Sequence, residues 1–205
     1  MARRAADMMH SPIAIPTMLY QIISLLLEVV AGLIAGTCLL RLYMQYQRIP
    51  MSTRSGNPLA RFIFALTDWL VLPLRRVVPA IGRLDTASLL GAFLVQLLQF
   101  VILWGITGMG TSVLSIVVLA AFGLVRMAIS GLTGLVIIYA ILSWVQTQSI
   151  AADFLERLVL PLLMPIRRVV PLVGGIDLSP LVLLLILQVA GIVLGNLQAA
   201  VLFAI

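Results

Sequence analysis

The stretch "PLRRVVPAIGRLD", Pro73–Asp85, returns as "PIRRVVPLVGGID", Pro165–Asp177. We call these stretches the first and the second arginine motif. The copies lie 92 positions apart and keep both arginines, both outer prolines and the closing aspartate in register. Eleven residues after each aspartate comes a glutamine, Gln96 in one copy and Gln188 in the other. Identities held in one register over this length indicate an internal repeat.

Each arginine motif lies between two long apolar segments. Of the 205 residues, 62% are hydrophobic, whereas soluble domains have roughly 45–50% apolar residues. Windows with at most one charge, and about 20 residues long as a ~30 Å hydrocarbon core requires, begin at Met18, Thr86, Ser112 and Leu178. The sequence therefore predicts an all-α integral membrane protein of two tandem repeats. Each repeat has two transmembrane helices joined by a loop, and the loop carries an interfacial amphipathic helix and a P-x-R-R-V-V-P hinge.

The repeats set the domain boundaries that we expect within one membrane domain. An N-terminal segment covers residues 1–17, the first repeat covers 18–108, and the second covers 109–205. The nearly unbroken apolar run 112–145 is too long for one simple span and too short for two with a turn. We expect one crossing from about Met127 to Val145, preceded by an apolar segment that lies at or dips into the outer face.

The charges predict the orientation in the membrane. All 13 basic residues are arginine, and the net charge is +6. This excess could indicate nucleic-acid binding, but in a membrane protein it is typical of arginine-rich cytoplasmic loops. Both arginine motifs then face one side, because each repeat crosses the membrane an even number of times. We expect a multi-pass protein of the bacterial inner (plasma) membrane with cytoplasmic arginine loops, and no nucleic-acid partner.

The composition argues against most enzyme chemistry. Without lysine the chain lacks a P-loop and a Schiff-base residue. Its one cysteine, Cys38, and one histidine, His10, exclude the usual zinc and haem ligand sets. We therefore expect no catalytic residue, no metal site, no cofactor and no enzyme activity.

The arginine motifs are the first candidate sites. The prolines should hold the arginines on a short, stiff turn, and each aspartate occupies the N-cap position of the next span. One interpretation is that the arginines bind anionic lipid head groups and fix the topology. The other is that they form a docking site for a protein partner, shaped by Arg–Asp pairs. The candidate residues are Arg75, Arg76, Arg167, Arg168, Asp85 and Asp177.

The loop segments before the arginine motifs resemble amphipathic helices. "NPLARFIFALTDWLVLP", 57–73, reads as an interfacial helix, and "DFLERLVLPLLMP", 153–165, is its counterpart. Pro161 weakens a continuous helix in the second copy. The alternative is that both helices face the protein core.

Four polar residues lie inside the apolar runs. Glu28 and Arg126 are equivalent positions in the two repeats and suggest an ion pair between the halves, although both fall near the outer interface. Gln96 and Gln188 fall near mid-membrane and should form hydrogen bonds between helices. A solute path lined by these four residues is the minority interpretation.

The motifs resemble the YggT family of small bacterial and plastid membrane proteins. The most specific pieces are "LTDWLVLPLRRVVPAIGRLD", 66–85, and "LPLLMPIRRVVPLVGGIDLSPLVLLLILQ", 160–188, and the resemblance extends from about Tyr20 to Ala200. The first copy departs from the fuller form, with Thr86 and Ser88 where the second has Leu178 and Pro180. The resemblance implies an inner-membrane protein without established enzyme activity. Family members are linked to osmotic or potassium tolerance, to division-gene neighbourhoods and, in plastids, to haem attachment.

Two functions remain open from the sequence. The first is a non-enzymatic scaffold or assembly factor that docks an unidentified membrane-protein partner through its cytoplasmic arginine loops. The alternative is a small oligomeric ion or solute channel or transporter involved in osmotic (potassium) homeostasis. Four spans can hardly enclose a pore without oligomerising, so a homo-oligomer belongs to this second hypothesis.

Overall fold

The chain is all-helical in the computed structural model, which describes residues 14–49, 59–80, 82, 84–107, 112–145, 150–170 and 177–205. Within these residues, four helices are long and apolar enough to cross a membrane, which confirms the predicted multi-pass architecture. Two shorter helices, α3 and α6, lie between the spans of each repeat and extend into the arginine motifs. The helices are α2 Ala14–Tyr46, α3 Ala60–Val77, α4 Thr86–Thr107, α5 Val113–Trp144, α6 Ile150–Arg167 and α7 Ser179–Ala204.

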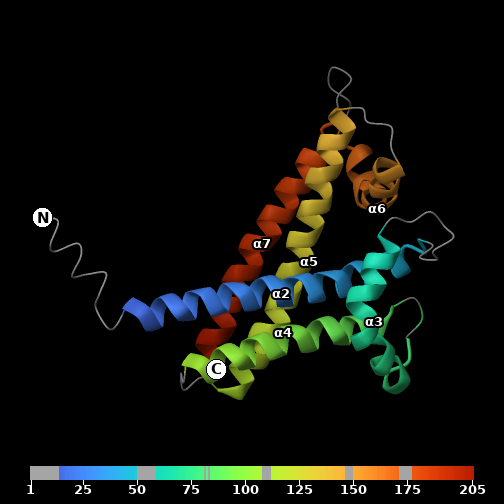
Figure 1. Ribbon diagram of the computed structural model, residues 1–205. Coiled ribbons are helices and arrows are strands. Elements are labelled where there is room, and N and C mark those ends of the chain that lie inside the picture. Colours follow the sequence, from blue (N-terminus) through green and yellow to red (C-terminus); the bar gives the residue numbers. More distant parts are fainter. Residues whose placement is uncertain are drawn as a thin grey trace, which may run out of the picture.

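The spans form two antiparallel pairs, one for each repeat (Figure 1). Helix α2 lies beside α4, and α5 lies beside α7, while α4 and α2 also contact α5. The two pairs cross in Figure 1, with α3 and α6 together at one end and the start of α2 and the end of α7 at the other. Both arginine motifs therefore lie at one end of the molecule, as an even number of crossings per repeat requires.

Helix α5 corrects the expectation for residues 112–145. It is one continuous helix of 32 residues, about 48 Å long at ~1.5 Å per residue, with no separate segment before Met127. Gly123, Gly131 and Gly134 do not interrupt it, because glycine keeps its backbone N–H and a helix in lipid satisfies its polar groups internally. A span of this length fits a bilayer by tilting.

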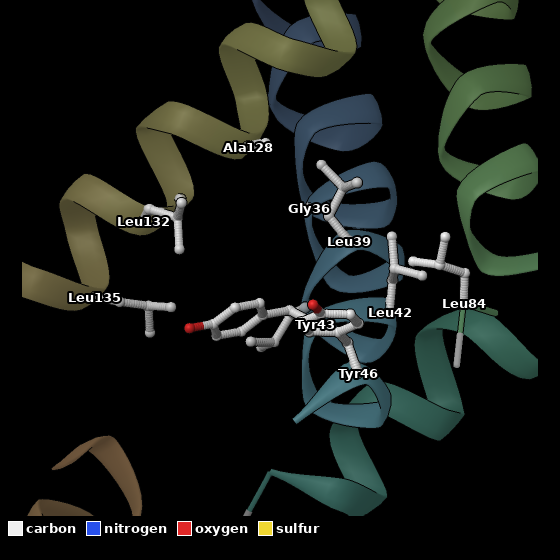
Figure 2. A pocket seen from close by; sticks show the side chains of 11 residues that line it. Gly36, Leu39, Leu42, Tyr43, Tyr46, Leu84, Ala128, Leu132 and Leu135 are labelled. Atoms are coloured by element: carbon white, nitrogen blue, oxygen red, sulfur yellow. The ribbon is translucent and has the colours of Figure 1, made fainter. Parts of the chain in front are cut away.

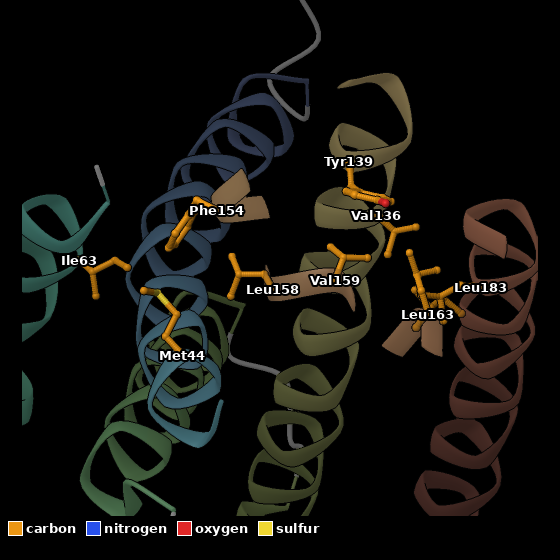
Figure 3. Packing of buried hydrophobic residues seen from close by; sticks show 10 residues of the cluster. Met44, Ile63, Val136, Tyr139, Phe154, Leu158, Val159, Leu163 and Leu183 are labelled. Carbon is orange, nitrogen blue, oxygen red and sulfur yellow. The ribbon is translucent and has the colours of Figure 1, made fainter. Parts of the chain in front are cut away.

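The loop helices pack onto the spans rather than lying free at the surface. Ile63 of α3 and four residues of α6 are buried in one cluster with residues of α2, α5 and α7. Figure 3 shows Phe154 and Leu158 of α6 on the α2 side of the cluster and Leu163 beside Leu183 of α7. Trp69 lies on the outer face of α3 and is 62% exposed. These helices are therefore amphipathic, with one face in the core and the other outward.

Prolines inside α3 and α6 contradict the expected turns. Helix α3 continues through Pro73, and α6 continues through Pro161 and Pro165. Leu70 and Leu74 lie on either side of Pro73 in the sequence, and the side chains of both pack against Gly91 of α4. This packing outweighs the backbone hydrogen bond that proline removes. Arg75 and Arg76 thus lie in the last turn of α3, Arg167 lies in the last turn of α6, and Arg168 follows it directly. Helix C-termini favour positive charge.

Candidate functional site

In the first arginine motif, the first arginine fastens the end of α3 to the start of α4. Arg75 Nη2 lies 2.5 Å from Asp85 Oδ2, and the carboxylate side chain is only 2% exposed. Asp85 directly precedes α4 and accepts a second hydrogen bond from Ser88 Oγ at 2.6 Å. The Thr86 hydroxyl donates to the Pro79 carbonyl at 2.7 Å. These contacts connect the end of α3, the loop that follows it and the start of α4.

The second arginine motif makes the same ion pair with different supporting contacts. Arg167 Nε donates to Asp177 Oδ2 at 2.8 Å, and Arg167 Nη2 donates to the Tyr139 hydroxyl of α5 at 2.8 Å. Asp177 Oδ1 accepts the backbone N–H of Ser179 at 2.9 Å. The N-cap of α7 is Leu178, so Asp177 lies one residue before the expected capping position and still binds the first turn.

The sequence differences between the copies explain the different contacts. The first copy has hydroxyls at Thr86 and Ser88, which close its loop and hold its aspartate. The second has Leu178 and Pro180 at the equivalent positions. It uses the Ser179 backbone and Tyr139 instead.

Both aspartates are held ionised by these contacts. Burial raises the pKa of the Asp85 carboxyl, but hydrogen bonds from Arg75 and Ser88 outweigh it and hold the pKa below its ordinary value. Burial likewise raises the pKa of Asp177, and hydrogen bonds from Ser179 and Arg167 lower it overall. Each motif therefore keeps a complete Arg–Asp pair at neutral pH.

The second arginine of each motif takes no part in the ion pair. Arg76 and Arg168 are both exposed, and neither has a hydrogen bond or ion pair to another described residue. The two arginines of each motif thus differ in role. Arg75 and Arg167 bind within the chain, whereas Arg76 and Arg168 present a guanidinium group outward at the same end of the molecule.

A buried arginine that the repeat pattern did not indicate connects α2 to α3. Arg41 is 2% exposed, and its Nη1 donates to Thr67 Oγ1 and to Asp68 Oδ1, both at 2.7 Å. Its guanidinium carbon also lies 5.0 Å from the centre of the Phe64 ring. Two sequence features could have indicated this pair. Arg41 is a basic residue inside the apolar run that begins at Met18, and Asp68 is an acidic residue in the following loop helix.

The suggested ion pair between Glu28 and Arg126 does not form. Arg126 Nη2 donates to Gln198 Oε1 of α7 at 2.7 Å, and Glu28 is exposed on α2. Arg126 thus connects the two spans of one repeat and does not link the halves. Gln198 has no counterpart in the repeat pattern, so the pattern gave no signal for it.

The matched glutamines occupy different surroundings. Gln96 is 4% exposed and contacts α5, with its Nε2 lying 3.8 Å from Met127 Sδ. Gln188 is exposed and lines a groove of about 360 Å³ between α5 and α7, together with Arg126. The structure therefore brings Arg126 and Gln188 together and keeps Gln96 and Glu28 apart from them. No cluster of three His, Cys, Asp or Glu side chains suited to a metal occurs in the described part of the chain.

Comparison with known proteins agrees with this repeat architecture. The CCB3/YggT family model matches residues 17–106 and 118–198, one segment in each repeat. An uncharacterized protein of Vibrio alginolyticus is 34% identical over 88% of this chain and 97% of its own length. The YggT protein of Escherichia coli K12 is 36% identical over 82% of this chain and 86% of its own. A Pseudomonas aeruginosa protein is 32% identical over 85% of this chain and 89% of its own length.

No solved structure shows a significant match. The family model covers both helical pairs and both arginine motifs, and the relatives align over most of their own length. The chain belongs to the CCB3/YggT family, and its two repeats are the two family segments.

Proposed function

We propose that the protein is a non-enzymatic scaffold or assembly factor of the bacterial inner membrane, which docks a membrane-protein complex through its cytoplasmic arginine motifs. The observation that carries the proposal is that the two arginines of each motif are in different environments. One arginine is fixed by an aspartate, and the next is exposed with no partner among the described residues. The repeat duplicates this arrangement at one end of the molecule.

The geometry favours recognition of an acidic partner over a purely local role. Arg76 follows directly on the anchored Arg75, and Arg168 on the anchored Arg167, so the exposed cations sit on fixed backbone. A preorganised cation loses less conformational freedom on binding than one on a flexible loop. Guanidinium groups suit bidentate contacts with carboxylate or phosphate.

The channel alternative draws less support from the arrangement of the polar residues. Gln96 lies buried against Met127, Glu28 faces outward from α2, and Gln188 opens onto the groove between α5 and α7. Together they line no single path through the described residues.

The test is quantitative mass spectrometry of proteins that co-purify from native membranes. We expect a partner to be lost from the Arg76→Gln/Arg168→Gln variant at equal membrane levels. The matched control is Arg61→Gln/Arg157→Gln, which removes the same charge from exposed positions on α3 and α6. Equal loss in both variants would indicate non-specific charge effects and contradict docking at the motifs. Ion flux through liposomes that disappears with Gln96→Leu would favour the channel.

A further inference from the structure

An apolar cavity of about 510 Å³ separates α2 of the first repeat from α5 of the second. Figure 2 shows Tyr43 and Tyr46 at one end of it, with Ala128 of α5 toward the other. Its volume falls within the ~300–1,000 Å³ typical of ligand sites. The remaining lining residues are Gly36, Leu39, Leu40, Leu42, Leu84, Gly131, Leu132 and Leu135.

A polar pocket adjoins the cavity at the end that carries the first arginine motif. It has a volume of about 360 Å³ and is lined by Gln45, Arg75, Ala80, Gly82, Leu84 and Asp85. Leu84 lines both spaces, and Gln45 precedes Tyr46 of the cavity. An apolar space thus meets a polar one at the end of a membrane span.

We infer that this double site binds a membrane phospholipid, with one acyl chain between α2 and α5 and the phosphate group against Arg75 and Gln45. An acyl chain in this position would lie along α2 and α5, whose residues line the cavity of about 510 Å³. The walls are almost entirely aliphatic, so they suit a hydrocarbon chain and no polar solute.

The charges at the polar end suit a phosphate. The Arg75 side chain is 39% exposed, while its partner Asp85 is 2% exposed. Asp85 lines the same pocket, but it is nearly buried, so the guanidinium of Arg75 presents more of its surface to the pocket than the carboxylate does. Tyrosines are enriched at head-group level, and Tyr43 and Tyr46 lie between the hydrocarbon and polar ends of the site.

A lipid fits this position better than a second copy or another protein. The cavity lies between two membrane spans of the same chain, where the surrounding solvent is acyl chains. The equivalent arginine, Arg167, donates to Tyr139 and Asp177 and lines neither of these two spaces. Arg167 is thus not part of this site, and the inference does not depend on the docking function proposed above.

Two glycines of α5 provide a matched test. A Cβ added at Gly131 or at Gly134 meets no atom within 4 Å. Gly131 lines the cavity, whereas Gly134 lines the groove on the α7 side. Gly131→Leu should therefore fill the acyl-chain site, and Gly134→Leu should leave it open.

The measurement is quantitative lipid mass spectrometry of protein purified in mild detergent. We expect wild type and Gly134→Leu to retain one phospholipid per chain, and Gly131→Leu to lose it while its helical circular dichroism is unchanged. Arg75→Gln should also release the lipid, whereas Arg167→Gln, which breaks the equivalent ion pair, should not. Equal retention in the Gly131 and Gly134 variants, or no retained lipid in wild type, would overturn the inference.

A second measurement needs no variant that might fail to fold. Phosphatidylglycerol with a photoreactive acyl chain, reconstituted with the wild-type protein, should label peptides that contain Leu39 or Leu132. Labelling spread evenly over the outward residues of α7 would overturn the site. Loss of lipid with an unchanged partner list would separate this inference from the docking proposal.

Discussion

The buried ion pair between Arg41 and Asp68 should contribute to stability asymmetrically. The Arg41 side chain is 3% exposed and that of Asp68 is 39% exposed. Replacing Asp68 by leucine leaves a guanidinium group inside the protein with Thr67 as its remaining hydrogen-bond acceptor. Replacing Arg41 by methionine leaves a carboxylate that water or lipid head groups can reach.

The magnitudes follow from these exposures. Removing one partner of a fully buried pair costs about 3–5 kcal/mol, and we place Asp68→Leu near ~3 kcal/mol because that carboxylate is partly solvated. Arg41→Met loses a hydrogen bond, ~1 kcal/mol, and the contact with the Phe64 ring, ~0.5–1 kcal/mol, but retains apolar packing. We expect it to cost about 1–2 kcal/mol. The double variant should be no less stable than Arg41→Met, because no uncompensated charge remains.

The assay is reversible unfolding in mixed micelles with increasing denaturing detergent, analysed as a double-mutant cycle. The control pair is Arg61→Met and Asp153→Leu, which are exposed residues on α3 and α6, and it should show no coupling. Asp68→Leu being no more destabilising than Arg41→Met would contradict the asymmetry. Additive effects in the double variant would contradict the ion pair.

Three further predictions concern the helix ends and the helix contacts. The folded-state pKa of Asp85 is below its ordinary value of 3.8, so the stability that its ionised form contributes is present above pH 3.8 and is lost as the pH falls through the folded pKa. When the free energy of unfolding is measured from pH 7 to pH 3, Asp85→Asn should therefore lose less stability on acidification than wild type. Gly123→Ala should destabilise by about 1–3 kcal/mol, since its Cβ would lie 2.9 Å from a side-chain oxygen of α4, whereas Gly134→Ala should stabilise by about 0.5–1 kcal/mol in the same assay. Arg126 and Gln198 should show a coupling of about 0.6 kcal/mol in a double-mutant cycle; a coupling of zero would contradict their hydrogen bond.

The sequence was informative where the two copies agree. The repeated arginine motif and the four apolar windows predicted the number of spans, the loop helices and the placement of both motifs at one end. The length of each apolar segment decides whether it can span the membrane. The number of such segments between the motifs then decides on which side each motif lies. The Arg–Asp pairs were also foreseeable, because both partners lie in one motif.

The sequence was misleading where local rules competed with packing. Proline rules predicted turns at Pro73 and Pro165, but contacts with neighbouring spans keep α3 and α6 helical. The length rule predicted a break in residues 112–145, but α5 tolerates its glycines as one long helix. In both cases the deciding contacts come from another segment.

A membrane protein of two repeats follows from the order of residues, because apolar length and duplicated motifs can be recognised there. The packing of the helices, in contrast, buries Arg41 against Asp68, pairs Arg126 with Gln198, and places Gln96 and Gln188 in different surroundings. A polar side chain among apolar helices binds whichever partner the neighbouring helix presents. That choice depends on residues at which the copies have diverged, so the internal symmetry of the sequence could not supply it.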